Sequence, residues 1–128
     1  MKILLDTCTF LWAISADRRL SGSAAEMIAD RENAVFLSAV SGWEVAIKFR
    51  LGRLPLPTNP ERFVQEWRRA HGLESLPLEE ESALYEHRLP ALHRDPFDRM
   101  LICQSIVHGC ALLTPDPMIH QYPVRTLW

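Results

Sequence analysis

The chain has 128 residues, of which 48% are hydrophobic, which is enough apolar material for a single domain (residues 1–128) with one core. No apolar run approaches the roughly 20 residues of a membrane span, and the start of the chain lacks the apolar stretch of a signal peptide. The three cysteines form no CxxC pair, so we expect a reduced, cytoplasmic setting and no disulfide framework. The net charge of −2 looks unfavourable for a nucleic-acid binder, but the balance becomes +2 if four of the 16 acidic residues are committed to a metal site.

Short apolar runs alternate with amphipathic segments along the whole chain, which is typical of strands alternating with helices. The runs that predict strands are residues 2–5, 34–37, 73–76, 111–114 and 124–128. Helices are predicted after Thr9, after Ser21, over about 39–51, from Pro60 to Gly72, over 78–89 and from Asp95 to Gly109. This alternation predicts an α/β fold with a central, mostly parallel sheet and right-handed crossovers.

The predicted helix over 39–51 carries an acid within its apolar pattern. Val40, Trp43, Ile47 and Leu51 fall at helical spacing and predict its buried stripe. Glu44 lies inside or beside that stripe, where a carboxylate requires a partner. That partner is either a bound cation or, in an ordinary i,i+4 pair, the ammonium group of Lys48.

Two further acids follow apolar runs directly. Asp6 comes after the first strand and Asp116 after the run at 111–114, so both are expected at the same rim of a parallel sheet. Helices that begin near this rim can present Glu44 and Asp98 to it. Four carboxylates at close range would raise one another's pKa values unless a cation is present, and hard ions such as Mg²⁺ or Mn²⁺ prefer oxygen ligands. The alternative is that Asp6 and Asp116 are turn residues and that Asp98 only completes a helix cap with Asp95.

Several other polar residues accompany these acids, and zinc is not expected because the histidines show no metal-ligand spacing. Hydroxyl or carboxylate side chains that could support the site are Thr7, Ser38, Ser41, Thr114 and Asp95, although caps and turns are the simpler interpretation. We interpret His93 as a structural or surface residue. Cys8 is interpreted as a packing residue, because the sequence places no base beside it.

Four motifs carry a resemblance to a known family: LLDT, SAVSGWEVAIK, HRDPFDRMLICQS and LLTPD. Together they resemble PIN-domain proteins, specifically the VapC-type toxins of type II toxin–antitoxin systems. The resemblance implies a PIN-like three-layer α/β/α fold and an endoribonuclease that depends on Mg²⁺ or Mn²⁺. It also implies a small antitoxin partner, a homodimer, and a metal site made of Asp6, Glu44, Asp98 and Asp116. Cys8 departs from the histidine or small polar residue expected at that position.

An RNA substrate would be held by basic side chains along its backbone, and arginine outnumbers lysine in this chain. The candidate RNA contacts are Lys48, Arg50, Arg53, Arg68, Arg69 and Arg99. The alternatives are a PIN-type RNA-processing nuclease that is not a toxin, and a catalytically silent RNA-binding or protein-binding module. A phosphatase with an aspartate nucleophile is disfavoured because Cys8 occupies the position of its second aspartate, and the features of a phospho-receiver domain are not evident.

Overall fold

A computed structural model describes all 128 residues. Its strands are β1 (Lys2–Leu5), β2 (Ala34–Ser38), β3 (Glu74–Leu76), β4 (Ala111–Leu113) and β5 (Thr126–Leu127). Its α-helices are α1 (Thr7–Ser15), α2 (Gly22–Ala29), α3 (Ala39–Arg50), α4 (Pro60–Ala70), α5 (Glu80–Tyr85) and α6 (Pro96–His108). Two short 3₁₀ helices, η1 (Glu86–Arg88) and η2 (Ile119–Gln121), complete the chain. None of the helices is both long and apolar enough to cross a bilayer.

All five strands form one sheet in the order β3-β2-β1-β4-β5, and every pairing between neighbours is parallel. The expected α/β fold is therefore confirmed. The last strand lies at an edge of the sheet, as predicted. The chain runs outward from β1 in one direction through β2 and β3, then returns to the other side of β1 as β4. This reversal between β1 and β4 is the topological switch point at which open α/β sheets bind their ligands.

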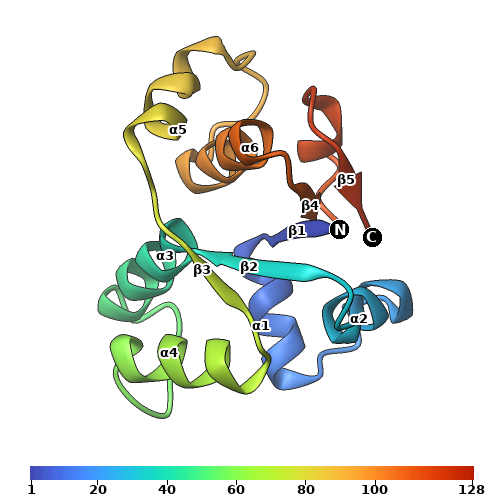
Figure 1. Ribbon diagram of the computed structural model, residues 1–128. Coiled ribbons are helices and arrows are strands. Elements are labelled where there is room, and N and C mark those ends of the chain that lie inside the picture. Colours follow the sequence, from blue (N-terminus) through green and yellow to red (C-terminus); the bar gives the residue numbers. More distant parts are fainter.

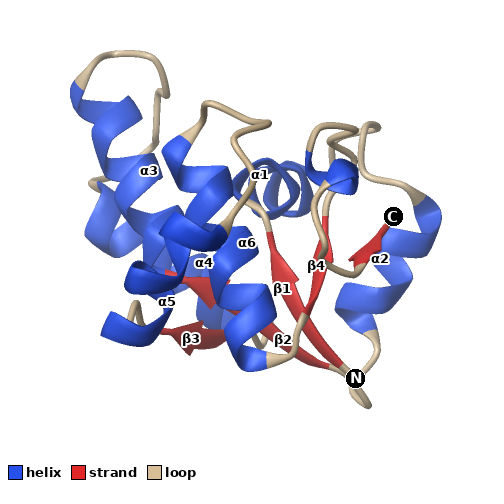
Figure 2. Cartoon of the chain, turned by 90° about the horizontal axis from the view of Figure 1, so that it is seen from above, coloured by secondary structure: helices blue, strands red, loops and turns tan.

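Helices cover both faces of the sheet and make it the middle of three layers (Figures 1 and 2). Leu4 of β1 packs on one face with Leu101 and Ile102 of α6. Ile3 and Leu5 point to the opposite face, where the core also contains residues from α1, α2 and α4. All of these side chains are fully buried, and burying each contributes about 1.5–3 kcal/mol to stability.

Most predicted helix boundaries agree with the structure, because the capping residues act locally. The side chains of Ser21, Ser38, Asn59 and Asp95 each accept a hydrogen bond from a backbone N–H in the first turn of the helix that follows. Gly109 ends α6 with a φ of 68°, a left-handed conformation that glycine adopts without strain. The predicted helix over 78–89 is divided into α5 and η1.

Two local predictions are wrong. The cap of α1 is Asp6, not Thr9: the carboxylate of Asp6 accepts the Thr9 N–H, and the Thr9 hydroxyl donates to the Leu113 carbonyl. The buried side of α3 is also rotated from the predicted stripe. Trp43 and Leu51 are 59% and 50% exposed, and the buried residues are Val40, Ser41, Glu44 and Val45. The rotation places the polar positions of α3 against the rim of the sheet.

Candidate functional site

Asp6 and Asp116 flank the switch point of the sheet. Asp6 follows β1, and its backbone N–H donates to the carbonyl of Leu113, the last residue of β4. Asp116 lies three residues further along the chain after β4. Because Leu5 and Leu113 are aligned across the β1–β4 pair, both acids leave the sheet at the same rim. The proximity of these two positions was predicted from the apolar run before each acid.

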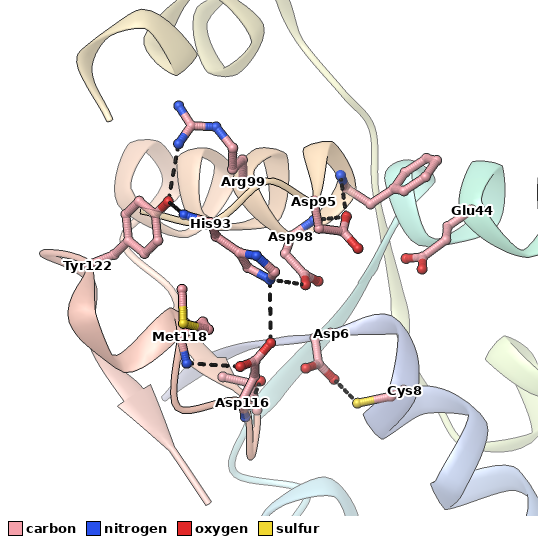
Figure 3. A network of polar contacts seen from close by, with 12 residues as sticks. Asp6, Cys8, Glu44, His93, Asp95, Asp98, Arg99, Asp116, Met118 and Tyr122 are labelled. Carbon is pink, nitrogen blue, oxygen red and sulfur yellow. Dashed lines mark hydrogen bonds and ion pairs between the residues drawn. The ribbon is translucent and has the colours of Figure 1, made fainter. Parts of the chain in front are cut away.

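Glu44 and Asp98 reach the same rim from helices. Glu44 lies in the second turn of α3, which begins directly after β2, and it is only 4% exposed. Asp98 lies in the first turn of α6. The C-terminal end of α6 leads into the start of β4, so its N-terminal end lies at the carboxyl rim of the sheet. The two helices thus present one carboxylate each to the acids that follow the strands (Figure 3).

The four acids line one cleft of about 260 Å³. Its lining residues are Asp6, Thr7, Cys8, Leu11, Glu44, Lys48, Asp95, Asp98 and Asp116. Within this region, ligand atoms of His93, Asp98 and Asp116 lie within 4.8 Å of one another. Asp6 and Glu44 are not part of this closest group.

Backbone and side-chain donors hold Asp6 and Asp116 in place. Asp6 is 3% exposed, and its Oδ1 accepts from the Thr9 N–H at 2.8 Å and from the Cys8 thiol at 3.3 Å. The Oδ1 of Asp116 accepts from the Met118 N–H at 2.9 Å. Each carboxylate is therefore partly compensated by its own local segment of chain.

Glu44 has only one of its two oxygens compensated. Its Oε2 pairs with the ammonium group of Lys48, so the predicted i,i+4 ion pair is present. Its Oε1 is buried and has no hydrogen-bond partner. A buried carboxylate oxygen without a partner is costly. This oxygen and the aspartate oxygens of the cleft form the donor set that suits Mg²⁺ or Mn²⁺.

Asp98 has the most strongly perturbed carboxyl group of the cleft. Burial raises its pKa to about 7, and the charges of Asp95, Asp6 and Glu44 act in the same direction. The hydrogen bond from His93 opposes this rise in pKa. Near neutral pH the ionised Asp98 carboxylate therefore destabilises the metal-free fold, and a bound cation would relieve this effect.

The Cys8 side chain faces Asp6. Burial raises the pKa of its thiol, and the negative charge of Asp6 raises it further. The protonated sulfur therefore serves as a hydrogen-bond donor to Asp6 and is not an activated nucleophile.

The five residues proposed to support the acids have different roles. The Thr7 hydroxyl donates to Ser41 Oγ at 3.0 Å and connects α1 to α3 close to Glu44. Thr114 Oγ1 accepts from the Asp116 N–H at 3.1 Å and fixes the turn after β4. Asp95 caps α6, as predicted. The Ser38 hydroxyl donates to Gln104 and does not contact any of the four acids.

Two of the six basic residues are poorly placed for an RNA bound at the acids. Arg69 lies with Asn33 and Glu74, at the amino ends of β2 and β3, on the rim opposite the cleft. The guanidinium of Arg99 donates to Glu86, to the Pro90 carbonyl and to the Tyr122 hydroxyl, and its side chain is only 13% exposed. Its donors are therefore used within the fold.

The other four basic residues lie on α3, after it or on α4, which packs against it. Lys48 lines the cleft itself and is paired with Glu44. Arg50 and Arg53 are exposed at the C-terminal end of α3 and just beyond it. Arg68 borders a shallow groove with Gly42 and Ala46 of α3.

His93 is the site residue that the sequence interpretation missed. Its Nε2 lies 2.9 Å from Asp98 Oδ2 and 3.5 Å from Asp116 Oδ2, between the two carboxylates (Figure 3). The residue precedes α6 in a segment without periodicity, and one of its partners is 23 positions away. The available signals were its position before the capping residue Asp95 and its place at the start of the HRDPFDRMLICQS motif.

Comparisons with known proteins agree with this architecture. Among solved structures, the VapBC2 complex of Rickettsia felis bound to promoter DNA matches with a TM-score of 0.75 at 16% identity, covering 100% of this chain and 98% of that one. The DNA-bound VapBC complex of Salmonella typhimurium gives a TM-score of 0.68 at 16% identity, covering 100% and 97%. At these identities the likeness shows a shared fold.

Sequence comparison extends the relationship. Ribonuclease VapC16 of Mycobacterium tuberculosis is 39% identical over 62 residues, which cover 48% of this chain and 43% of that protein. The match therefore spans less than half the length of this relative. The family model of the PIN domain matches residues 3–124, nearly the whole chain. With this match, a parallel sheet in the order β3-β2-β1-β4-β5 and acids at its switch point, the chain belongs to the PIN domain family.

Proposed function

We propose that this protein is an endoribonuclease dependent on Mg²⁺ or Mn²⁺ that acts as the toxin of a toxin–antitoxin pair. The observation that carries the proposal is the single cleft lined by Asp6, Glu44, Asp98 and Asp116. The names of the relatives point the same way, since one is a ribonuclease VapC and both solved structures described above are VapBC complexes. The partners inferred on this basis are an RNA, a small antitoxin and a second copy of the chain.

The four acids would hold the cation, and the remaining charged groups would position the RNA. A bound divalent cation supplies charge neutralisation and Lewis acidity toward a phosphodiester and the attacking water. Glu44 would take part in holding the cation through Oε1, which has no hydrogen-bond partner, because Oε2 is already bonded to Lys48. Lys48 limits the negative charge on the α3 side of the cleft, where the anionic RNA backbone must approach.

RNA binding is proposed along α3 and its surroundings, where Lys48, Arg50, Arg53 and Arg68 lie. These groups would contact phosphates, so affinity should fall as salt concentration rises. Arg69 and Arg99 are left out of this surface because of their positions in the fold.

The test is cleavage of a 5′-labelled single-stranded RNA by the purified chain, freed of any antitoxin, with Mg²⁺ or Mn²⁺ or with EDTA. The variants Asp6→Asn and Glu44→Gln should lose cleavage. Asn at position 6 retains a good cap for α1, so the fold should survive. Glu66→Gln is the matched control, because Glu66 is an exposed acid paired with Arg62 and does not line the cleft. Equal cleavage by all variants in EDTA would rule out the proposal.

The toxin role requires a separate experiment. Expression of the wild-type chain should slow growth, and the Asp6→Asn variant should not. Co-expression of a neighbouring small gene should restore growth if that gene encodes the antitoxin. Active enzyme without any effect on growth would favour the alternative of an RNA-processing nuclease. Sequencing the 5′ ends produced after induction would identify the RNA and the cleavage site.

A further inference from the structure

The imidazole of His93 lies at distances from two carboxylates that suit a metal ligand. Its Nε2 is 2.9 Å from an oxygen of Asp98 and 3.5 Å from an oxygen of Asp116. Adjacent ligands around a six-coordinate ion with bonds of about 2.1–2.2 Å are about 3 Å apart. The imidazole nitrogen is therefore about as far from each carboxylate oxygen as neighbouring donors around one cation are, and the three ligand atoms all lie within 4.8 Å of one another.

A set of hydrogen bonds holds His93 in this position from its backbone. The His93 N–H donates to the Tyr122 hydroxyl at 2.7 Å, and the same hydroxyl accepts from Arg99 at 3.1 Å. Arg99 follows Asp98 in α6 (Figure 3). It is itself paired with Glu86 at 2.7 Å. The histidine and Asp98 are therefore positioned by the same helix. This support fixes the backbone of His93 and keeps its imidazole beside Asp98.

We propose that His93 is a direct nitrogen ligand of the divalent cation, together with Asp98 and Asp116, and that the site consequently prefers Mn²⁺ to Mg²⁺. This inference rests on the metal site of the proposed function and specifies its selectivity. Both ions bind oxygen donors, but Mn²⁺ is a transition-metal ion and accepts an imidazole nitrogen more readily than Mg²⁺ does. A ligand nitrogen must be unprotonated, so His93 would carry its proton on Nδ1.

The competing role for His93 is purely electrostatic. A histidine that only donates a hydrogen bond to Asp98 would offset negative charge and would be displaced when a cation binds. In that case its removal would change the affinities for Mn²⁺ and Mg²⁺ by the same factor. A direct ligand predicts a selective loss of Mn²⁺ binding.

The first test measures the wild-type chain, stripped of metal with a chelator and reloaded with Mn²⁺ alone. Pulsed electron paramagnetic resonance should show ¹⁴N modulation from a nitrogen bonded directly to Mn²⁺. Isothermal titration should show tighter binding of Mn²⁺ than of Mg²⁺. Mn²⁺ binding without ¹⁴N modulation would overturn the inference and leave the proposed function standing. If neither cation bound, both this inference and the proposed function would be overturned.

The second test uses His93→Gln, which retains a polar side chain of similar reach. We expect the ¹⁴N modulation to disappear and Mn²⁺ affinity to fall at least tenfold, with Mg²⁺ affinity changed less than threefold. His87→Gln is the matched control, because His87 is an exposed histidine in η1 and should show no change. Equal losses for both ions, or ¹⁴N modulation that persists in His93→Gln, would contradict direct ligation.

Discussion

Neutralising Asp98 should stabilise the fold in the absence of metal. Burial and the neighbouring acids raise the pKa of this carboxyl from 3.8 to about 7. At about 1.36 kcal/mol for each pKa unit, holding the ionised form in the folded state costs about 4 kcal/mol. The side chain is 19% exposed, so solvent screening reduces this cost. The variant Asp98→Asn, which has nearly the same shape and no charge, should therefore gain about 1–4 kcal/mol above pH 8.

The gain should depend on pH in a defined direction. Because the pKa of Asp98 is raised in the folded state, the protonated carboxyl makes its full contribution to the stability of the wild-type fold below pH 3.8. This contribution is lost as pH rises from about 4 through the folded-state pKa of about 7. Asn does not titrate, so the difference in stability between variant and wild type should grow over that interval and then level off.

The assay is thermal and urea unfolding of chelator-treated protein at pH 4.5 and pH 8.5. A gain of 1 kcal/mol corresponds to a rise in Tm of about 3 °C for a domain of this size. Asp17→Asn is the control: hydrogen bonds from Arg19 lower the pKa of that carboxyl to about 2, so its neutralisation should bring no gain. If Asp98→Asn were no more stable than wild type at pH 8.5, the cleft would not hold unfavourable charge. Added Mn²⁺ should stabilise the wild-type chain and not the variant.

Three further predictions concern the fold. Ser21→Ala removes the cap of α2 and should cost about 1 kcal/mol in urea unfolding, whereas Ser23→Ala, on the exposed surface of that helix, should be nearly neutral. Gln104→Met leaves the Ser38 hydroxyl and a backbone carbonyl without their buried partner, so the midpoint of urea unfolding should fall by the equivalent of about 1–3 kcal/mol. Leu4→Ala creates a cavity in the central strand and should cost about 2–5 kcal/mol, measured by thermal unfolding.

Much of the sheet was predictable because its signals are local. Each core strand is a short apolar run, and the capping residues or glycines that limit most helices lie within a few positions of the helix ends. Asp6 and Asp116 could be related because each follows an apolar run, and parallel strands end at the same rim. The remaining step, that β4 lies directly beside β1, is a matter of topology and came from the structure.

The orientation of α3 was not predictable in the same way. The helix has two overlapping apolar stripes, and periodicity alone does not decide which of them packs inward. Trp43 belongs to the exposed stripe, where its ring packs edge-on against Phe97 at a centroid distance of 5.2 Å. Burial of Glu44 follows from this rotation. Likewise, positive charge alone could not show that Arg99 is bonded within the fold.

The partners of the four acids explain why Asp98 and His93 should be regarded as one unit. Asp6 and Asp116 accept backbone N–H groups, and Glu44 has Lys48. Asp98 has only the imidazole of His93 as a hydrogen-bonded side-chain partner. The excess negative charge of the cleft is therefore concentrated where a histidine already lies between two carboxylates. A cation at this point would replace the single hydrogen bond of Asp98 with several stronger interactions. Asp98, whose charge destabilises the metal-free fold most, is therefore the acid that a bound cation would stabilise most.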